Sequence, residues 1–114
     1  MHVSDIWTCD QNGNSKTTFS RPGTVYWKTK IVDAGGSPVA GVTVTCDLYR
    51  PDGSLWVANK TSTTDAGGIA SNSNAINQNS STGTYTIRVK SVVKTGWTYN
   101  SGANIKTETT FVVQ

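Results

Sequence analysis

The sequence predicts an all-β fold, a sandwich of two stacked sheets containing seven or eight antiparallel strands. Two observations support this: apolar and polar residues alternate with a period of two in several segments, and turn-forming residues separate these segments about every ten residues. Helical periodicity is nearly absent. The 114 residues match the size of one domain, so we expect residues 1–114 to form a single domain with one core.

Three segments, residues 24–32, 42–49 and 85–93, alternate most clearly and supply most of the expected core. Trp27 and Cys46 belong to their inward-facing, apolar sets. Residues 71–83 are polar and low in complexity, which indicates a long loop. The strands predicted in this way are 2–7, 24–32, 42–49, 55–61, 69–71, 85–93 and 107–113, with 96–104 as a loop or an irregular strand.

The tripeptide Gly83-Thr84-Tyr85 opens a late strand. A tyrosine in this place is typical of the tyrosine corner of Greek-key sandwiches, where its hydroxyl bonds back to upstream backbone. We therefore expect Tyr85 to have a structural role and the sandwich to have Greek-key connections.

Charge and composition limit the choice of partners. The net charge is +3, but the basic residues are dispersed and form no run, so no nucleic-acid partner is expected. No apolar stretch reaches the roughly 18–20 residues that cross a membrane. Only 15% of the residues are charged, and Thr, Ser, Asn and Gly are abundant, as in exported proteins. We therefore expect a monomeric module that is extracellular or at the cell surface. Residues 1–7 do not resemble a signal peptide, so we expect the export signal to lie elsewhere in a longer secreted polypeptide.

No catalytic site is expected. The only histidine is His2, at the terminus, whereas a Ser-His-Asp site needs a histidine positioned by buried neighbours. Turns account for the acidic residues Asp33, Asp52 and Asp65, which leaves no carboxylate pair for hydrolysis. The sequence thus predicts a protein that is not an enzyme and uses no cofactor.

One loop carries weak candidates for a calcium site. Asp10, Asn12 and Asn14 place oxygen ligands at alternate positions, as calcium-binding loops do. The pattern then fails, because Ser15 and Arg21 stand where an EF-hand has glycine and glutamate. A polar loop without metal is the favoured interpretation.

The two cysteines, Cys9 and Cys46, fit one disulfide in an exported protein. Such a bond would close a loop of about 36 residues and add on the order of 3–4 kcal/mol. The sequence does not give their distance, and an inert buried thiol at Cys46 is the alternative.

Four tryptophans in 114 residues are a surplus. Trp27 is assigned to the core, but Trp7, Trp56 and Trp97, together with Tyr99, are candidate binding aromatics. Exposed aromatic rings stack on sugars and anchor protein partners, although packing is the favoured role for each of these residues. A sugar platform would need two or three of them coplanar on one sheet face.

Three segments resemble bacterial immunoglobulin-like modules of the invasin/intimin type: VDAGGSPVAGVTV at 32–44, TTDAGGIA at 63–70 and GTYTIRV at 83–89. The opening residues 1–6 are similar to the start of an accessory immunoglobulin-like domain of secreted bacterial proteases and other exported hydrolases. The resemblance implies an immunoglobulin-like sandwich that is extracellular, non-catalytic and appended to something larger, with neighbouring domains as partners. It supplies no set of functional residues.

Two functional hypotheses follow. The first is a structural spacer or domain-stabilising unit of a larger secreted protein. The second is a module that binds carbohydrate or a cell-surface protein through exposed tryptophan and tyrosine residues. They differ in whether these aromatic side chains gather on one open surface.

Overall fold

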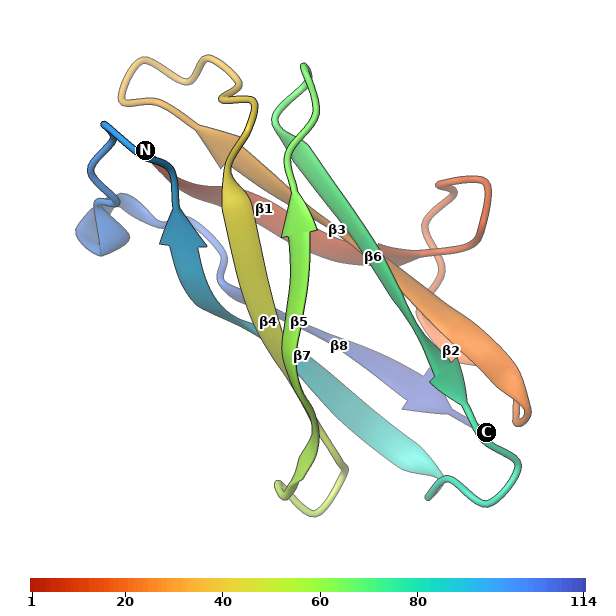
Figure 1. Ribbon diagram of the computed structural model, residues 1–114. Helices are drawn as coiled ribbons and strands as arrows, with labels where there is room; N and C mark the ends of the chain where they lie inside the picture. The colour runs from red at the N-terminus through yellow and green to blue at the C-terminus, as the bar shows by residue number, and fades with distance from the viewer.

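The computed structural model describes residues 1–114 and consists of two stacked β-sheets (Figure 1). The smaller sheet has the strand order β1 (His2–Cys9), β3 (Gly23–Val32) and β6 (Ile69–Ile76). The larger sheet has the order β2 (Thr18–Phe19), β8 (Glu108–Val113), β7 (Gly83–Val93), β4 (Thr43–Tyr49) and β5 (Leu55–Thr63). A short 3-10 turn, η1 (Ser101–Ala103), precedes β8. The predicted all-β sandwich is confirmed.

The connections are those of an immunoglobulin-like sandwich, in which the chain crosses between the sheets rather than running through each in order. It passes to the larger sheet after β1 and returns after β2, passes again to the larger sheet after β3 and returns after β5, and crosses finally to the larger sheet after β6. One pairing differs from the all-antiparallel prediction: the two residues of β2 pair in parallel with β8. This strand is too short to show a period-two pattern in the sequence.

The core lies between the sheets and contains 19 buried apolar residues. Trp27 on β3 and Cys46 on β4 are buried as the alternation predicts. Tyr85 stacks on Phe111 with ring centroids 5.2 Å apart, and Phe19 meets Phe111 edge-on at 5.7 Å. The aromatic rings thus join β7, β8 and β2 at one end of the core.

Strand β6 corrects the sequence-based prediction, which ended this strand at residue 71 and placed a loop over 71–83. The strand continues to Ile76, and its eight residues pair with β3 without a register shift. Asn and Ser have low strand propensity, so the local sequence gives little sign of a strand. Burial of Ala70 and Ile76 against the core, together with the ladder to β3, outweighs that propensity.

Three tight turns share the same chemistry. In the loops that begin at Asp10, Asp33 and Asp65, the carboxylate accepts hydrogen bonds from backbone N–H groups two and four residues on, at 2.9–3.1 Å. A glycine with positive φ follows three residues after each aspartate. The Gly68 position excludes any side chain, because a Cβ there would lie 2.6 Å from the Ile31 carbonyl oxygen.

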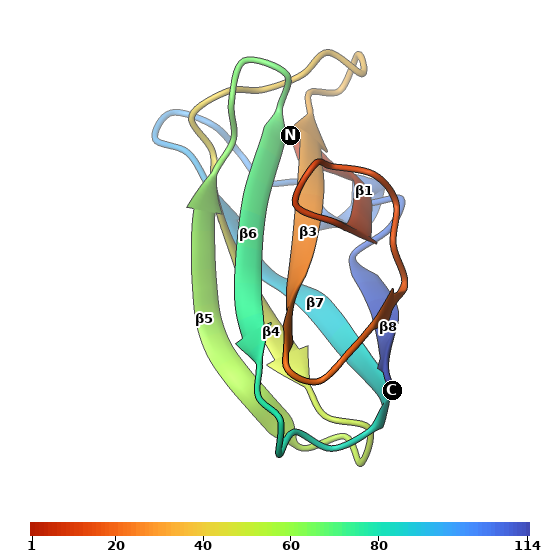
Figure 2. The same cartoon turned by 90° about the vertical axis from the view of Figure 1, so that its right-hand side faces the viewer.

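The sandwich is elongated, with extents of 43 × 28 × 20 Å, and its N- and C-termini lie at opposite ends (Figures 1 and 2). The segment between β7 and β8 runs beside β1 at the N-terminal end. Its Thr98 carbonyl accepts a hydrogen bond from the Met1 amino group at 2.9 Å, and the Ile105 N–H donates to the Val3 carbonyl at 2.9 Å. This segment therefore covers the outer edge of the smaller sheet. The structure contains no helix of the length and apolarity that crossing a membrane requires.

Candidate functional site

A hollow of about 220 Å³ lies at the C-terminal end of the sandwich. Its walls come from the β4–β5 hairpin and from the loop between β6 and β7, which lie close to the C-terminus (Figure 2). Arg21 holds this end together: its Nε donates to the Gln114 carbonyl at 3.2 Å and its Nη1 to the Ser80 carbonyl at 2.8 Å. The lining residues are Arg50, Trp56, Asn77, Asn79, Ser80, Ser81 and Tyr85.

Tyr85 forms the floor of the hollow. Its side chain is buried, and its hydroxyl donates to the Ser81 carbonyl oxygen at 2.7 Å, the contact that a tyrosine corner requires. Burial raises the pKa of Tyr85, while the nearby cations Arg50 and Arg21 oppose that rise. The hydroxyl therefore stays a hydrogen-bond donor that fixes the end of the 77–82 loop.

Trp56 and Arg50 form one wall. The half-buried indole of Trp56 meets Tyr85 edge-on, with ring centroids 4.8 Å apart, so the core holds it in place. The Arg50 Nη1 donates to the Leu55 carbonyl at 2.6 Å, which holds the guanidinium across the hairpin. Sequence reasoning missed Arg50 because position 50 shows only an arginine before a predicted turn.

The four candidate binding aromatics do not share a surface. Trp7 pairs with Lys28 on the outer face of the smaller sheet, and Trp56 lines the hollow just described. Trp97 lies in the β7–β8 segment, 44% exposed, with the Lys94 ammonium 5.2 Å from its ring centroid. Tyr99 is half-buried, and its hydroxyl accepts a hydrogen bond from the Asn104 side chain. The coplanar platform that sugar stacking would need is not present.

The predicted disulfide is not formed: Cys9 and Cys46 are both buried, free thiols. Cys9 pairs with Tyr26 and shares its face, the outer face of the smaller sheet, whereas Cys46 points into the core from the larger sheet. Burial raises the pKa of both thiols, that of Cys46 to about 11. Both are therefore structural, poorly reactive thiols.

Cys9 borders a second, smaller hollow of about 90 Å³ on that outer face. Tyr26, Lys28 and Ser71 form its rim, and the Lys28 ammonium donates to the Ser71 hydroxyl at 3.0 Å. This hydrogen bond holds the Lys28 side chain across the rim.

The calcium candidates form a self-contained turn. The Asp10 carboxylate accepts hydrogen bonds from the backbone N–H groups of Asn12 and Asn14 at 2.9 Å and from the Asn14 side-chain amide at 3.4 Å. The Asn14 backbone N–H is the main cause that lowers the pKa of Asp10. No group of three His, Cys, Asp or Glu side chains is arranged to hold a metal ion. The Asp10 carboxylate, the one charged candidate ligand, thus bonds to its own loop.

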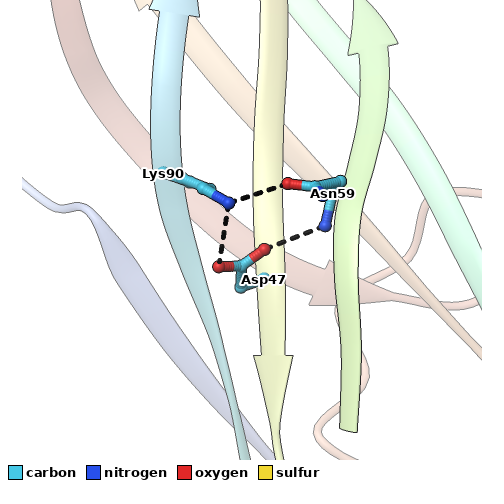
Figure 3. A network of polar contacts seen from close by, with 3 residues as sticks. All are labelled: Asp47, Asn59 and Lys90. Carbon is cyan, nitrogen blue, oxygen red and sulfur yellow. Dashed lines mark hydrogen bonds and ion pairs between the residues drawn. The ribbon is translucent and has the colours of Figure 1, made fainter. Parts of the chain in front are cut away.

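A polar network that the sequence did not reveal stands on the outer face of the larger sheet (Figure 3). Asn59 has a positive φ of 59° at a bulge in β5, and its N–H donates to the Asp47 carboxylate at 2.9 Å. The Lys90 ammonium donates to the Asn59 side-chain oxygen at 2.8 Å and lies 3.9 Å from the other Asp47 oxygen. Asparagine tolerates this backbone conformation, and the bulge distorts an edge strand in a way that hinders pairing with other chains.

The two stacked sheets and the crossings between them define an immunoglobulin-like sandwich. The chain belongs to the MG2 domain family, whose model matches residues 19–113. The MG2 domain is a non-catalytic, immunoglobulin-like domain of macroglobulin-like proteins. The expectation of an immunoglobulin-like module is confirmed, but the matched family is MG2 rather than the invasin/intimin type or the accessory domain of secreted proteases.

Solved structures agree on the fold. The chain is similar to Escherichia coli alpha-2-macroglobulin activated by porcine elastase, with a TM-score of 0.66 and 19% identity over 96% of this chain and 8% of that one. Trypsin-activated alpha-2-macroglobulin from Escherichia coli gives a TM-score of 0.66 and 19% identity over 97% of this chain and 7% of that one. No curated protein sequence matches the chain. The chain thus spans under a tenth of the length of either matched structure.

Proposed function

We propose that residues 1–114 form one non-catalytic structural domain of a larger alpha-2-macroglobulin-like protein, in which the domain packs against its neighbours. The observation that carries the proposal is the MG2 match over residues 19–113. The shape supports it, since a polypeptide that passes through this domain enters at one end of a 43 Å body and leaves at the other (Figure 1).

The exposed apolar side chains support a packing role at the N-terminal end. Val93, Trp97 and Ile105 are 61%, 44% and 75% exposed, and all three lie between the end of β7 and the start of β8. Large apolar residues that are left open in an isolated domain are typical of surfaces that another domain covers. Tryptophan in particular is enriched among residues that anchor interfaces.

The proposal extends to the location of the protein, outside the cell or at its surface. Its support is compositional: few charged residues and many Thr, Ser, Asn and Gly residues. Protease treatment of intact producing cells tests it, since an external domain is digested without lysis. Digestion only after lysis would contradict this location.

The packing role is tested by the substitution Trp97→Ser in the 114-residue chain and in the longer polypeptide that contains it. In the chain alone we expect a loss of unfolding free energy of about 1 kcal/mol, because the ring is 44% exposed and its contact with the Lys94 ammonium is worth about 0.5–1 kcal/mol at an exposed site. In the longer polypeptide we expect a loss of about 2 kcal/mol or more, as for a buried interface anchor.

The matched control is Leu55→Ser, which removes another exposed apolar side chain, 48% exposed, from the β4–β5 end of the sandwich. Its effect should be the same in both polypeptides. Equal effects of Trp97→Ser in the two contexts would argue against packing through this segment.

A further inference from the structure

The hollow at the C-terminal end holds several polar groups that the fold itself does not use. No hydrogen bond within the chain engages the side-chain amides of Asn77 or Asn79 or the indole N–H of Trp56. Ser80 and Arg50, in contrast, already hold the loop and the hairpin in place. The polar groups without a hydrogen-bond partner thus lie on a hairpin and a loop that other hydrogen bonds hold in place.

The hollow also carries a positive charge, that of Arg50. None of the three ion pairs of the chain includes Arg50, which keeps guanidinium N–H groups beyond the one that bonds the Leu55 carbonyl. Arg50 is the charged side chain among the residues that line the hollow, and its guanidinium favours a ligand with one negative charge.

The dimensions of the hollow restrict the ligand further. A volume of about 220 Å³ suits a single sugar ring rather than a chain of sugars. The half-buried indole of Trp56 lines the hollow, and side-chain amides can both donate to and accept from the hydroxyls of such a ring.

We propose that this hollow binds a single acidic sugar, with Trp56 against the ring, Asn77 and Asn79 on the hydroxyls, and Arg50 on the carboxylate. The proposal goes beyond the packing role and does not depend on it. The site also differs from an aromatic platform, because one tryptophan acts together with polar groups inside a hollow.

The test is a titration of the isotope-labelled 114-residue chain, followed by amide signals in nuclear magnetic resonance spectra. Glucuronate and galacturonate are the probes, and glucose, galactose and acetate are the comparison ligands. We expect saturable shifts at residues 50–56 and 77–85 with at least one uronate and an affinity in the millimolar range, about 1 mM. The neutral sugars and acetate should bind about tenfold more weakly or not at all.

Two variants separate binding from folding. Asn79→Ala removes an exposed amide that makes no hydrogen bond within the chain and should weaken uronate binding several-fold, while Asn12→Ala, in another loop, should not change it. Arg50→Gln should weaken uronate binding about tenfold and leave the weak binding of glucose unchanged.

Four results would overturn the proposal. The first three are the absence of saturable shifts with both uronates, equal shifts with glucose or galactose, and equal shifts with acetate, which would reveal a site for any carboxylate. The fourth is uronate binding that survives both Asn79→Ala and Arg50→Gln, which would place the ligand elsewhere. All of these results are distinct from a failure of the packing role, because they concern the opposite end of the sandwich from the β7–β8 segment.

Discussion

Removal of one oxygen atom from Tyr85 tests whether the tyrosine corner stabilises this sandwich. The substitution Tyr85→Phe keeps the ring that stacks on Phe111 but deletes the hydroxyl that donates to the Ser81 carbonyl at 2.7 Å. No backbone N–H donates to the same carbonyl oxygen, so the substitution leaves it without a partner in the chain. The corner joins the 77–82 loop to β7, and the loss should therefore affect global stability.

The expected magnitude follows from the burial of this contact. An ordinary hydrogen bond contributes about 0.5–1.5 kcal/mol net, and a buried acceptor left without a partner costs about 1–3 kcal/mol. Because the hydroxyl is buried and the carbonyl lies near the surface, we predict a loss of about 1.5 kcal/mol for Tyr85→Phe. For a chain of this size with a urea m-value of about 1.5 kcal/mol/M, the unfolding midpoint falls by about 1 M.

The assay is urea denaturation followed by tryptophan fluorescence, in which the buried Trp27 reports global unfolding. Tyr26→Phe is the matched control, since the Tyr26 hydroxyl makes no hydrogen bond in the chain and its loss should change stability by less than about 0.5 kcal/mol. Unchanged m-values are required for the comparison. If the two variants have the same midpoint, the corner contributes nothing and the reasoning is refuted.

Gly68→Ala should destabilise the fold by about 2 kcal/mol or more, because φ is +74° and the new Cβ would lie 2.6 Å from a carbonyl oxygen of β3. Thermal melting measures the effect. The control Gly36→Ala should have a much smaller effect, because that position has open space around it. Cys9 and Cys46 should both take up an alkylating label in denatured, unreduced protein, as measured by intact mass. An unlabelled mass would show that the two cysteines form a disulfide. For Asp10, a backbone N–H of its own loop holds the carboxyl pKa in the folded protein below 3.8, the value in the unfolded chain. The ionised carboxylate therefore stabilises the fold above pH 3.8, and this contribution is lost as the pH falls through the folded-state pKa. Acid denaturation of Asp10→Asn should accordingly show a stability that depends less on pH.

The sequence was sufficient for those parts of the fold in which local pattern and tertiary structure agree. Alternation predicted the core strands around Trp27, Cys46 and Tyr85, because each has one buried face. It failed for the second half of β6, where serine and asparagine pair with β3 and only Ile76 marks the buried face. It also failed for β2, whose two residues hold their place through pairing with β8.

The candidate sites were less accessible from the sequence. Alternation placed Cys46 in the core correctly, but only the pairing of Cys9 with Tyr26 shows that the two thiols face different sides. Nothing in the local sequence connects Arg50 with Asn79, which meet at one hollow because two loops end at the same side of the sandwich. Contacts between loops depend on topology, and topology leaves no periodic signal.

The central claim, that this MG2 domain is a structural module that packs against its neighbours, can be measured by hydrogen–deuterium exchange. The amides of residues 93–105 are compared in the 114-residue chain and in the longer polypeptide, with the β4–β5 hairpin at residues 50–54 as a reference. We predict slower exchange of 93–105 in the longer polypeptide, because a neighbouring domain covers Trp97 and Ile105 there. Equal exchange rates in the two polypeptides would contradict the claim.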